Sequence, residues 1–209
     1  MQVIHQELVN LVQVADLCAL GIPRESPATR DGALWHVTSL LRAGHSIVKG
    51  KDQYADSVEE ESGIMSMGRI WETAVDCYMY DLAGRLGGLY VPDVTYTEDD
   101  ICGSLDGVLA HPAFSEAIVC ESKLRFTLRE DIPLDHLQQI RAYCHLAGTD
   151  LAYYISGHIS TTPPFMRALL RILKFTPLSV SETWQGILNT KRYLEGLGIS
   201  PEGEQNARR

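Results

Sequence analysis

The chain has 209 residues, 45% of them hydrophobic, which suits one domain of ordinary size with a buried core. No stretch of about 18 apolar residues is present, and the start MQVIHQELVN has no basic region followed by a small-residue cleavage site. We therefore expect a cytoplasmic protein without a membrane span or signal peptide. The net charge of −9 counts against a nucleic-acid partner unless basic side chains gather locally, because phosphate binding depends on Lys and Arg.

The five cysteines are scattered, at positions 18, 77, 102, 120 and 144, and none is part of a Cys-x-x-Cys pair. An odd number without paired spacing argues against a disulfide framework, so we expect these thiols to be reduced and mostly buried. A zinc or iron–sulfur site would require distant cysteines to converge. The missing ligand spacing argues against such a site.

The first part of the chain is expected to be helical. Residues 2–20 and 31–44 carry apolar residues at helical spacing and are separated by a Pro- and Gly-bearing stretch. Residues 49–62 are polar and acidic, which is typical of a loop. The next helix is expected over 66–86, where apolar residues recur every three or four positions until Gly87 and Gly88 end the pattern.

Strands dominate the middle of the chain. Residues 91–97 and 101–109 read as two strands joined by the turn-forming sequence Glu98-Asp99-Asp100, and residues 116–126 read as a third. These three segments predict a hairpin-rich start to the sheet.

The remaining segments alternate between helix and strand. The expected elements are a helix over 133–147 with Gly148 after it, strands over 150–160 and 171–175, and a helix over 179–194. This order predicts an α/β fold in which a central mixed sheet is flanked by helices, with an N-terminal helical extension.

We expect three parts along the chain. Residues 1–62 would form the helical region and acidic loop, residues 63–200 the core, and residues 201–209 a fraying tail with the sequence PEGEQNARR after Ser200.

One predicted hairpin raises an electrostatic problem. Two apolar arms flank the sequence His-Pro-Ala-Phe-Ser, and a turn symmetric about Ala113 and Phe114 places Asp106 directly opposite Glu121. Residues paired in this way have Cβ atoms roughly 4.5–5.5 Å apart, so two like charges repel each other. Because strand side chains alternate, Lys123 lies on the face of Glu121. Two carboxylates and one ammonium therefore converge.

A divalent cation would resolve this repulsion. Mg²⁺ is held by one or two carboxylates together with waters and substrate phosphate oxygens. Lys123 could orient or help deprotonate a metal-bound water or neutralise charge on a phosphate, and Arg125 could hold a neighbouring phosphate. A Glu-x-Lys triplet alone is typical of a solvated strand face. The apolar setting of Asp106, where an unpaired carboxylate would be costly, favours the metal site instead.

Asp106, the triplet Glu121-Ser122-Lys123 and the segment from Gln139 to Tyr143 resemble the PD-(D/E)xK nuclease superfamily, most closely its RecB-like and lambda-exonuclease-like branch. The order and spacing agree from about residue 66 to residue 160 but not over residues 1–60. The resemblance implies a restriction-endonuclease-like core over residues 63–200.

The resemblance also implies roles for particular residues. An upstream helix in this branch carries Gly-x-x-x-His or Gly-x-x-x-Glu, which Gly68 and Glu72 match, so Glu72 joins Asp106 and Glu121 as a metal ligand. A solvent-facing glutamate is the alternative. The remaining implied contacts are the Ser122 backbone carbonyl to metal, and Arg125, Gln139, Tyr143, Arg69 and Arg129 to DNA. A purely structural pair is the alternative for Gln139 and Tyr143. His36, His45, His136 and His145 lack metal-site spacing and are expected at the surface or as satisfied core residues.

The function implied by the resemblance is hydrolysis of DNA with Mg²⁺ or Mn²⁺ and without an iron–sulfur cluster. An exonuclease acting on DNA ends in recombination, repair or phage DNA processing is the first hypothesis. The alternatives are a structure-selective or restriction-like endonuclease and a non-catalytic DNA-binding module. A recombinase or single-strand-annealing protein, or a homo-oligomer, is implied as the partner that keeps the enzyme on DNA, in the cytoplasm of a bacterial or phage-infected host cell.

Overall fold

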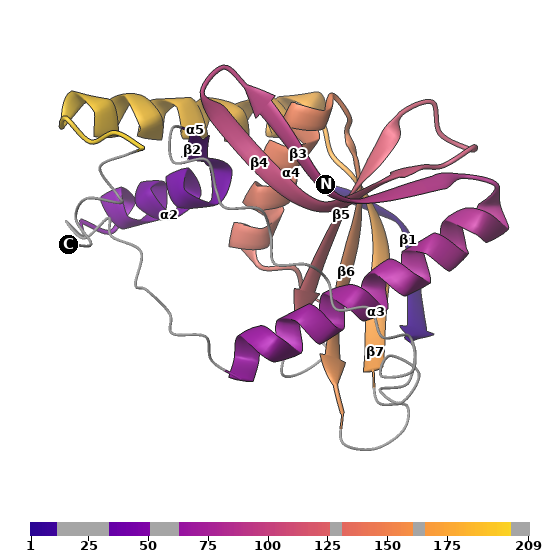
Figure 1. Ribbon diagram of the computed structural model, residues 1–209. Helices are drawn as coiled ribbons and strands as arrows, with labels where there is room; N and C mark the ends of the chain where they lie inside the picture. Colours follow the sequence, from indigo (N-terminus) through magenta and orange to yellow (C-terminus); the bar gives the residue numbers. More distant parts are fainter. Residues whose placement is uncertain (12–33, 51–62, 126–130, 161–165, 202–209) are drawn as a thin grey trace.

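The computed structural model describes residues 1–11, 34–50, 63–125, 131–160 and 166–201, except for the side chains of residues 63–67 and 69. Within these residues, no helix is both long and apolar enough to cross a membrane. The chain forms a mixed β-sheet with helices on both faces, which confirms the α/β fold expected from the sequence (Figure 1).

The sheet has seven strands in the order β1-β7-β6-β5-β4-β2, and β3 also pairs with β4. Parallel pairing joins β5 to β6 and β2 to β4, and the other neighbours are antiparallel. The strands are β1 (Gln2–Asn10), β2 (Trp35–His36), β3 (Leu89–Glu98), β4 (Ile101–Ala110), β5 (Ala117–Leu124), β6 (Leu151–Ile159) and β7 (Met166–Lys174).

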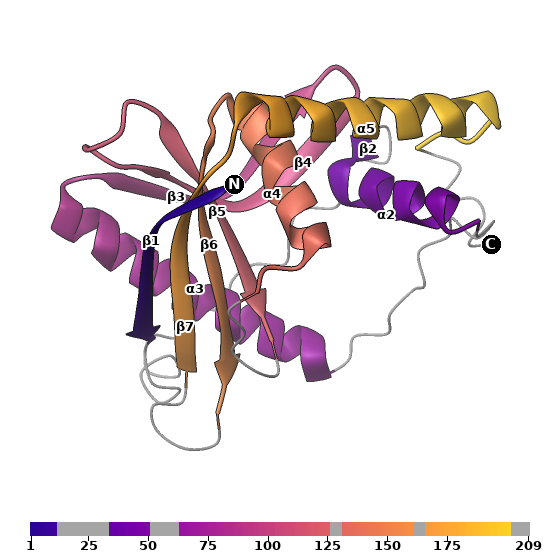
Figure 2. The same cartoon turned by 180° about the vertical axis from the view of Figure 1, so that it is seen from behind.

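Helices cover both faces of the sheet, and each face has its own apolar core. The helices are α2 (Val37–Val48), α3 (Gly63–Leu86), α4 (Leu134–Ala147) and α5 (Pro177–Gly196). Among the described helices, α3 packs across one face, where Trp71, Val75 and Met79 are buried against the sheet. α2, α4 and α5 cover the opposite face, as Figures 1 and 2 show from the two sides. Residues that alternate along each strand thus enter different cores.

The prediction of a helix at the start of the chain is wrong. Residues 2–20 were expected to be helical, but Gln2–Asn10 form the edge strand β1, paired antiparallel with β7. Helical spacing of apolar residues in a short segment does not reveal a pairing with a strand more than 150 residues away, which decides the structure here. The helix expected over 31–44 is found as α2, but it starts later, because Trp35 and His36 pair with β4.

The later elements agree with the expected order. α3, β3, β4, β5, α4, β6 and α5 all lie where the sequence predicts them, and β7 is longer than expected. The boundary after residue 62 stays a prediction. β1 and α2, which precede it, contact elements that follow it: β1 pairs with β7, and Gly44 of α2 lies against Thr190 of α5.

The connection between β5 and β6 determines what surrounds the C-terminal half of β5. These two strands are parallel, so the chain must cross over, and α4 makes the crossing on the face shared with α2 and α5. α4 ends at Gly148, whose φ of 66° is in the left-handed region that glycine adopts without strain. Tyr143 of α4 is consequently buried in the same core as Val119 of β5.

Candidate active site

The hairpin of β4 and β5 has the register expected from the sequence. Its backbone pairs are Gly107–Cys120, Val108–Val119, Leu109–Ile118 and Ala110–Ala117. The ladder ends just before the next pair in this register, Asp106 and Glu121, so the two are not paired directly as expected. Here Asp106 contacts β5 through its side chain: Oδ2 accepts hydrogen bonds from the Ser122 backbone N–H at 2.7 Å and from Ser122 Oγ at 2.9 Å.

Glu121 is a buried carboxylate with incomplete hydrogen bonding. Its exposed fraction is 1%, and within the described part of the chain Oε2 has no hydrogen-bond partner. Lys123 Nζ forms an ion pair with Oε1. Burial raises the pKa of Glu121 to about 8; the Lys123 charge opposes this increase, whereas Asp106 and Glu72 add to it. Desolvation together with the two neighbouring carboxylates therefore outweighs the single positive charge of Lys123.

Lys123 remains positively charged beside this carboxylate. Burial alone would lower its pKa, but the Glu121 carboxylate, followed by that of Asp106, raises the pKa above the ordinary lysine value. The neighbouring carboxylates thus favour the ammonium form of Lys123, which can neutralise negative charge or donate hydrogen bonds.

α3 brings Glu72 close to Glu121 and its charged neighbours Asp106 and Lys123. The Glu72 side chain is half-buried and close enough to Glu121 to raise the pKa of that carboxyl. The helix that carries Gly68 and Glu72 lies where the sequence predicts it. Arg69 is part of α3, but its side chain is outside the described set, and Arg129 is outside the described residues altogether.

α4 contributes the two remaining expected residues. Gln139 Nε2 donates to the Tyr143 hydroxyl at 2.9 Å, one helical turn away. Tyr143 is 2% exposed, and its pKa is raised by burial and then by the Glu121 carboxylate, which places the phenol beside the charged group. Gly103 of β4 makes room for this ring, since a Cβ there would lie 2.9 Å from Tyr143 Cε1.

A pocket of about 360 Å³ opens beside Lys123, between α2, β5 and α4. Its lining contains several groups that can hold an anion: Thr38, Arg42, His45, Lys123, His136 and Gln139. Sequence reasoning did not assign the α2 residues or His136 to the site. The signal available for His136 was its position three residues before Gln139, on the same face of a helix. Arg125, a predicted DNA contact, follows Lys123 and is close enough to lower the pKa of His136.

The four histidines named from the sequence all make side-chain contacts, as expected. His45 bonds Gln138 at 2.7 Å, His136 bonds the Tyr154 hydroxyl at 2.7 Å, and His145 lies 3.1 Å from Glu98. His36 Nδ1 is 3.3 Å from Cys102 Sγ.

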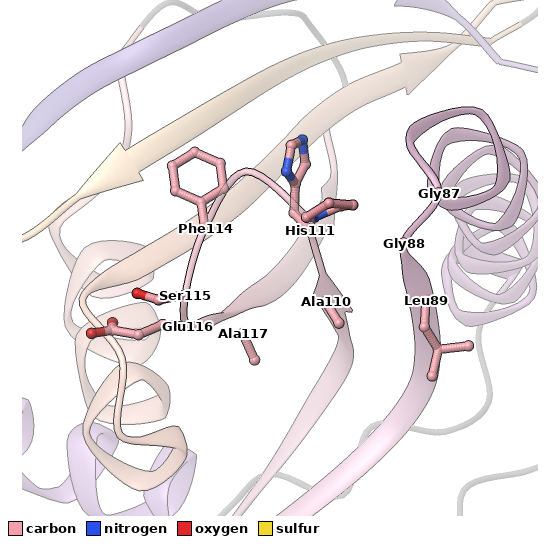
Figure 3. A pocket seen from close by; sticks show the side chains of 10 residues that line it. Gly87, Gly88, Leu89, Ala110, His111, Phe114, Ser115, Glu116 and Ala117 are labelled. Atoms are coloured by element: carbon pink, nitrogen blue, oxygen red, sulfur yellow. The ribbon is translucent and has the colours of Figure 1, made fainter.

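A second pocket, of about 450 Å³, lies at the turn end of the β4–β5 hairpin. Figure 3 shows His111 and Phe114 rising from the turn above Ser115 and Glu116, with Gly87 to Leu89 forming the other wall. Glu116 accepts a hydrogen bond from Thr149. None of the residues expected to carry chemistry lines this pocket.

The carboxylates of Asp106, Glu121 and Glu72 fit a divalent cation of the kind that keeps water ligands. Among the described residues, no three Asp, Glu, His or Cys side chains form a ready-made metal cage. Mg²⁺ does not require one, because one or two carboxylates with waters and phosphate oxygens complete its coordination. The Glu121 carboxylate has an oxygen without a hydrogen bond and an Asp and a Glu close by, which is the donor chemistry that such an ion takes.

Comparisons with known proteins find similarity in structure only. No protein-family model matches the chain, and neither does any curated protein sequence. The alkaline exonuclease of Laribacter hongkongensis has a TM-score of 0.53 at 10% identity, covering 78% of this chain and 89% of the exonuclease. The same exonuclease in complex with dAMP gives 0.52 at 11% identity, covering 79% and 89%. A phage-related exonuclease from Haemophilus somnus 129PT gives 0.48 at 11% identity, covering 90% and 94%. The chain therefore shares its fold with the Laribacter exonuclease.

Proposed function

We propose that the protein is a Mg²⁺- or Mn²⁺-dependent deoxyribonuclease that hydrolyses phosphodiester bonds. The observation that carries this proposal is the buried Glu121 carboxylate beside Asp106, with an oxygen without a hydrogen bond and a raised pKa. Lys123 compensates only one oxygen of this buried carboxylate, and a bound cation would compensate the other and the nearby acids. The Ser122–Lys123 sequence that follows it completes the motif of the PD-(D/E)xK superfamily.

Asp106, Glu121 and Glu72, with the Ser122 backbone carbonyl, are the proposed metal-binding groups. When bound there, the ion would polarise the phosphate and make a water nucleophilic at neutral pH. Lys123, kept protonated by its neighbours, is proposed to stabilise the negative charge that develops on the phosphate. The alternative role of Lys123, to orient or help deprotonate a metal-bound water, stays a prediction.

The pocket beside Lys123 is the proposed path of the DNA strand. Its lining combines the cations Arg42 and Lys123 with the hydroxyl of Thr38 and the amide of Gln139, beside one carboxylate, that of Asp135. The two cations and the neutral donors suit a phosphodiester backbone. Arg125 and Gln139 are the proposed strand contacts, and the buried Tyr143 is proposed to brace Gln139 through their hydrogen bond. Arg69 and Arg129 stay predictions. Arg42, Lys123 and the neighbouring Arg125 would supply local positive charge for DNA in a chain whose net charge is −9.

Exonuclease activity on DNA ends, within the RecB-like and lambda-exonuclease-like branch, is the proposed form of this activity. The shared fold of the Laribacter exonuclease, which is also known in complex with dAMP, supports it. A role in recombination, repair or phage DNA processing, a recombinase or annealing partner, and a homo-oligomer stay predictions.

The test compares linear and covalently closed circular DNA incubated with the full chain and Mg²⁺ or Mn²⁺. We expect loss of linear DNA only, abolished by chelation and by Lys123→Ala. Lys174→Ala is the matched control, because this lysine lies at the far end of β7 and pairs with Asp150 at 3.7 Å. Nicked or linearised circles would establish an endonuclease instead. A folded protein that binds DNA without cleaving it, with either metal, would establish a non-catalytic DNA-binding module.

A further inference from the structure

Tyr90 links α3 to the main chain of the strand that carries Asp106. Its ring is 2% exposed, and its hydroxyl donates to Asp76 Oδ1 at 2.8 Å. The same hydroxyl lies 3.3 Å from the main-chain oxygen of Asp106, which is a second acceptor. A single phenol therefore contacts both α3 and the main chain of β4.

The backbone pairing of β4 is interrupted at Asp106 on both sides. Pairing of β3 with β4 includes Pro92–Gly107 and Val94–Leu105 but omits Asp93 and Asp106 between them, and Asp93 has a φ of 51°. On the other side, the ladder with β5 has already ended. The register between β3 and β4 is the same on both sides of this gap, so no residue is inserted as it would be in a β-bulge. The direction of the Asp106 carboxylate is therefore set outside the regular ladder.

The side-chain pattern of β4 shows the same irregularity. Leu105 packs in the core shared with α4, whereas Gly107 faces Tyr90 in the core shared with α3. Residues two apart in a regular strand share one face, so the strand rotates at Asp106. Any Cβ at position 107 would overlap the Tyr90 hydroxyl, and glycine is what allows the ring to lie against the strand here.

We propose that Asp76 and Tyr90 are positioning residues that hold Asp106 in the direction required for metal binding. This inference rests on the proposed nuclease function and deepens it. Asp76 follows Glu72 by one helical turn, so α3 contributes Glu72 as a proposed metal ligand and Asp76 as the anchor of the Asp106 main chain. The two carboxylates on α3 and the one on β4 are then fixed relative to one another through the Tyr90 hydroxyl.

The alternative, a purely structural hydrogen bond, makes a different prediction. A structural role would lower the melting temperature without changing the metal site. A positioning role changes metal affinity and kcat but leaves KM for DNA unchanged, since the strand contacts lie elsewhere. Partners that orient a metal ligand typically account for roughly 10–100-fold in affinity or activity.

The experiment uses the full chain and measures Mn²⁺ affinity by calorimetry, with kcat and KM on linear DNA. We expect Tyr90→Phe and Asp76→Ala to lower Mn²⁺ affinity and kcat by about 10–100-fold. Asp76→Asn keeps an oxygen acceptor for the Tyr90 hydroxyl, so this variant should retain most of the Mn²⁺ affinity and most of kcat. Tyr80→Phe is the matched control: this tyrosine of α3 contacts the Tyr90 ring edge-on at 5.2 Å and is 52% exposed.

The outcomes separate the two proposals. The first outcome is an active wild type whose Tyr90→Phe and Asp76→Ala variants keep Mn²⁺ affinity and kcat within about twofold, instead of losing about 10–100-fold. This outcome overturns the positioning role alone. A folded wild type that takes up no Mn²⁺ and cleaves no DNA overturns the nuclease function and the positioning role together. If Tyr90→Phe fails to fold, the half-buried Asp76 supplies the test through the Ala and Asn pair.

Discussion

Asp106 and Ser122 are joined by two hydrogen bonds to one oxygen: the backbone N–H and the hydroxyl of Ser122 both donate to Asp106 Oδ2. This contact replaces the backbone ladder at the point where β4 and β5 separate. It holds the carboxylate from the side of β5, opposite to the contact that Tyr90 makes with the Asp106 main chain.

Removing the hydroxyl should weaken this contact without breaking it. Ser122→Ala keeps the backbone donor, so we expect a loss of about 0.5–1.5 kcal/mol in the free energy of unfolding. DNA cleavage should stay within roughly tenfold of wild type, as that free energy implies. Urea unfolding and single-turnover cleavage measure the two. A complete loss of cleavage in a folded Ser122→Ala protein would show that the hydroxyl itself contacts the metal or the substrate.

Metal binding should stabilise the wild type through the two carboxylates. At a Mn²⁺ concentration about 100 times its dissociation constant, binding to the folded state alone adds about 2.7 kcal/mol. We expect this gain, measured by thermal unfolding, to disappear in Glu121→Gln and Asp106→Asn. Glu182→Gln, an exposed position on α5, is the control and should show the full gain. If Mn²⁺ stabilised Glu121→Gln as much as the wild type, the metal would have to bind elsewhere than at β5.

Low pH should destabilise the protein through His136. Burial, followed by the charge of Lys123, lowers the pKa of His136 to about 4, whereas the unfolded chain has the ordinary value near 6.5. The unfolded state therefore binds more protons between pH 6.5 and 4, and stability falls as the pH decreases through that range. His136→Gln should flatten this part of the profile, measured by urea unfolding at a series of pH values. A profile identical to wild type would assign the acid sensitivity to other groups.

Packing around Tyr143 should tolerate no added atom on β4. A Cβ at position 103 would lie 2.8 Å from Leu146 Cδ1 and 2.9 Å from the Tyr143 ring. We expect Gly103→Ala to cost about 1–3 kcal/mol in the free energy of unfolding through overpacking. The matched control is Gly84→Ala, since an exposed helical glycine with no atom near its Cβ should instead gain roughly 0.5–1 kcal/mol. Equal effects at the two positions would contradict the close packing of Tyr143.

α2 should behave as part of the folded core. Leu40 is fully buried between α2, α5 and the sheet, and Leu40→Ala is expected to cost about 2–5 kcal/mol. Val48 on the same helix is 87% exposed, and Val48→Ala should change stability by less than about 0.5 kcal/mol. Chemical unfolding followed by circular dichroism measures the stability of the Leu40→Ala and Val48→Ala variants. A small effect at Leu40 would mean that α2 detaches without unfolding the sheet.

Local patterns predicted most of the sheet and the hairpin register. The alternation around Ala113 and Phe114 gave the pairs from Gly107–Cys120 to Ala110–Ala117, because a short turn fixes which residues meet. The motif residues Asp106, Glu121, Lys123 and Glu72 are brought together as the sequence predicted, and their chemical roles stay predictions. α4 was predictable from its helical pattern and the Gly148 stop.

Long-range relationships were not predictable in this way. Nothing local in Gln2–Asn10 identifies β7 as its partner, and a helix was expected there. The rotation of β4 at Asp106 depends on Asp93 and Tyr90 of the neighbouring strand, so one strand's sequence does not reveal it. Asp76 and Arg42 have ordinary helical positions, and their nearness to the site follows only from how α3 and α2 pack.

The pairing of β1 with β7 has a consequence for biosynthesis. β1 finds its neighbour only when residues 167–174 have left the ribosome, long after its own synthesis. Until then the edges of β1 lack this partner and are open to intermolecular pairing. A chaperone that shields extended segments could act on β1 throughout this interval. Moving Gln2–Asn10 to the C-terminus by circular permutation, behind α5 and a flexible linker, would shorten that interval and should speed cotranslational folding.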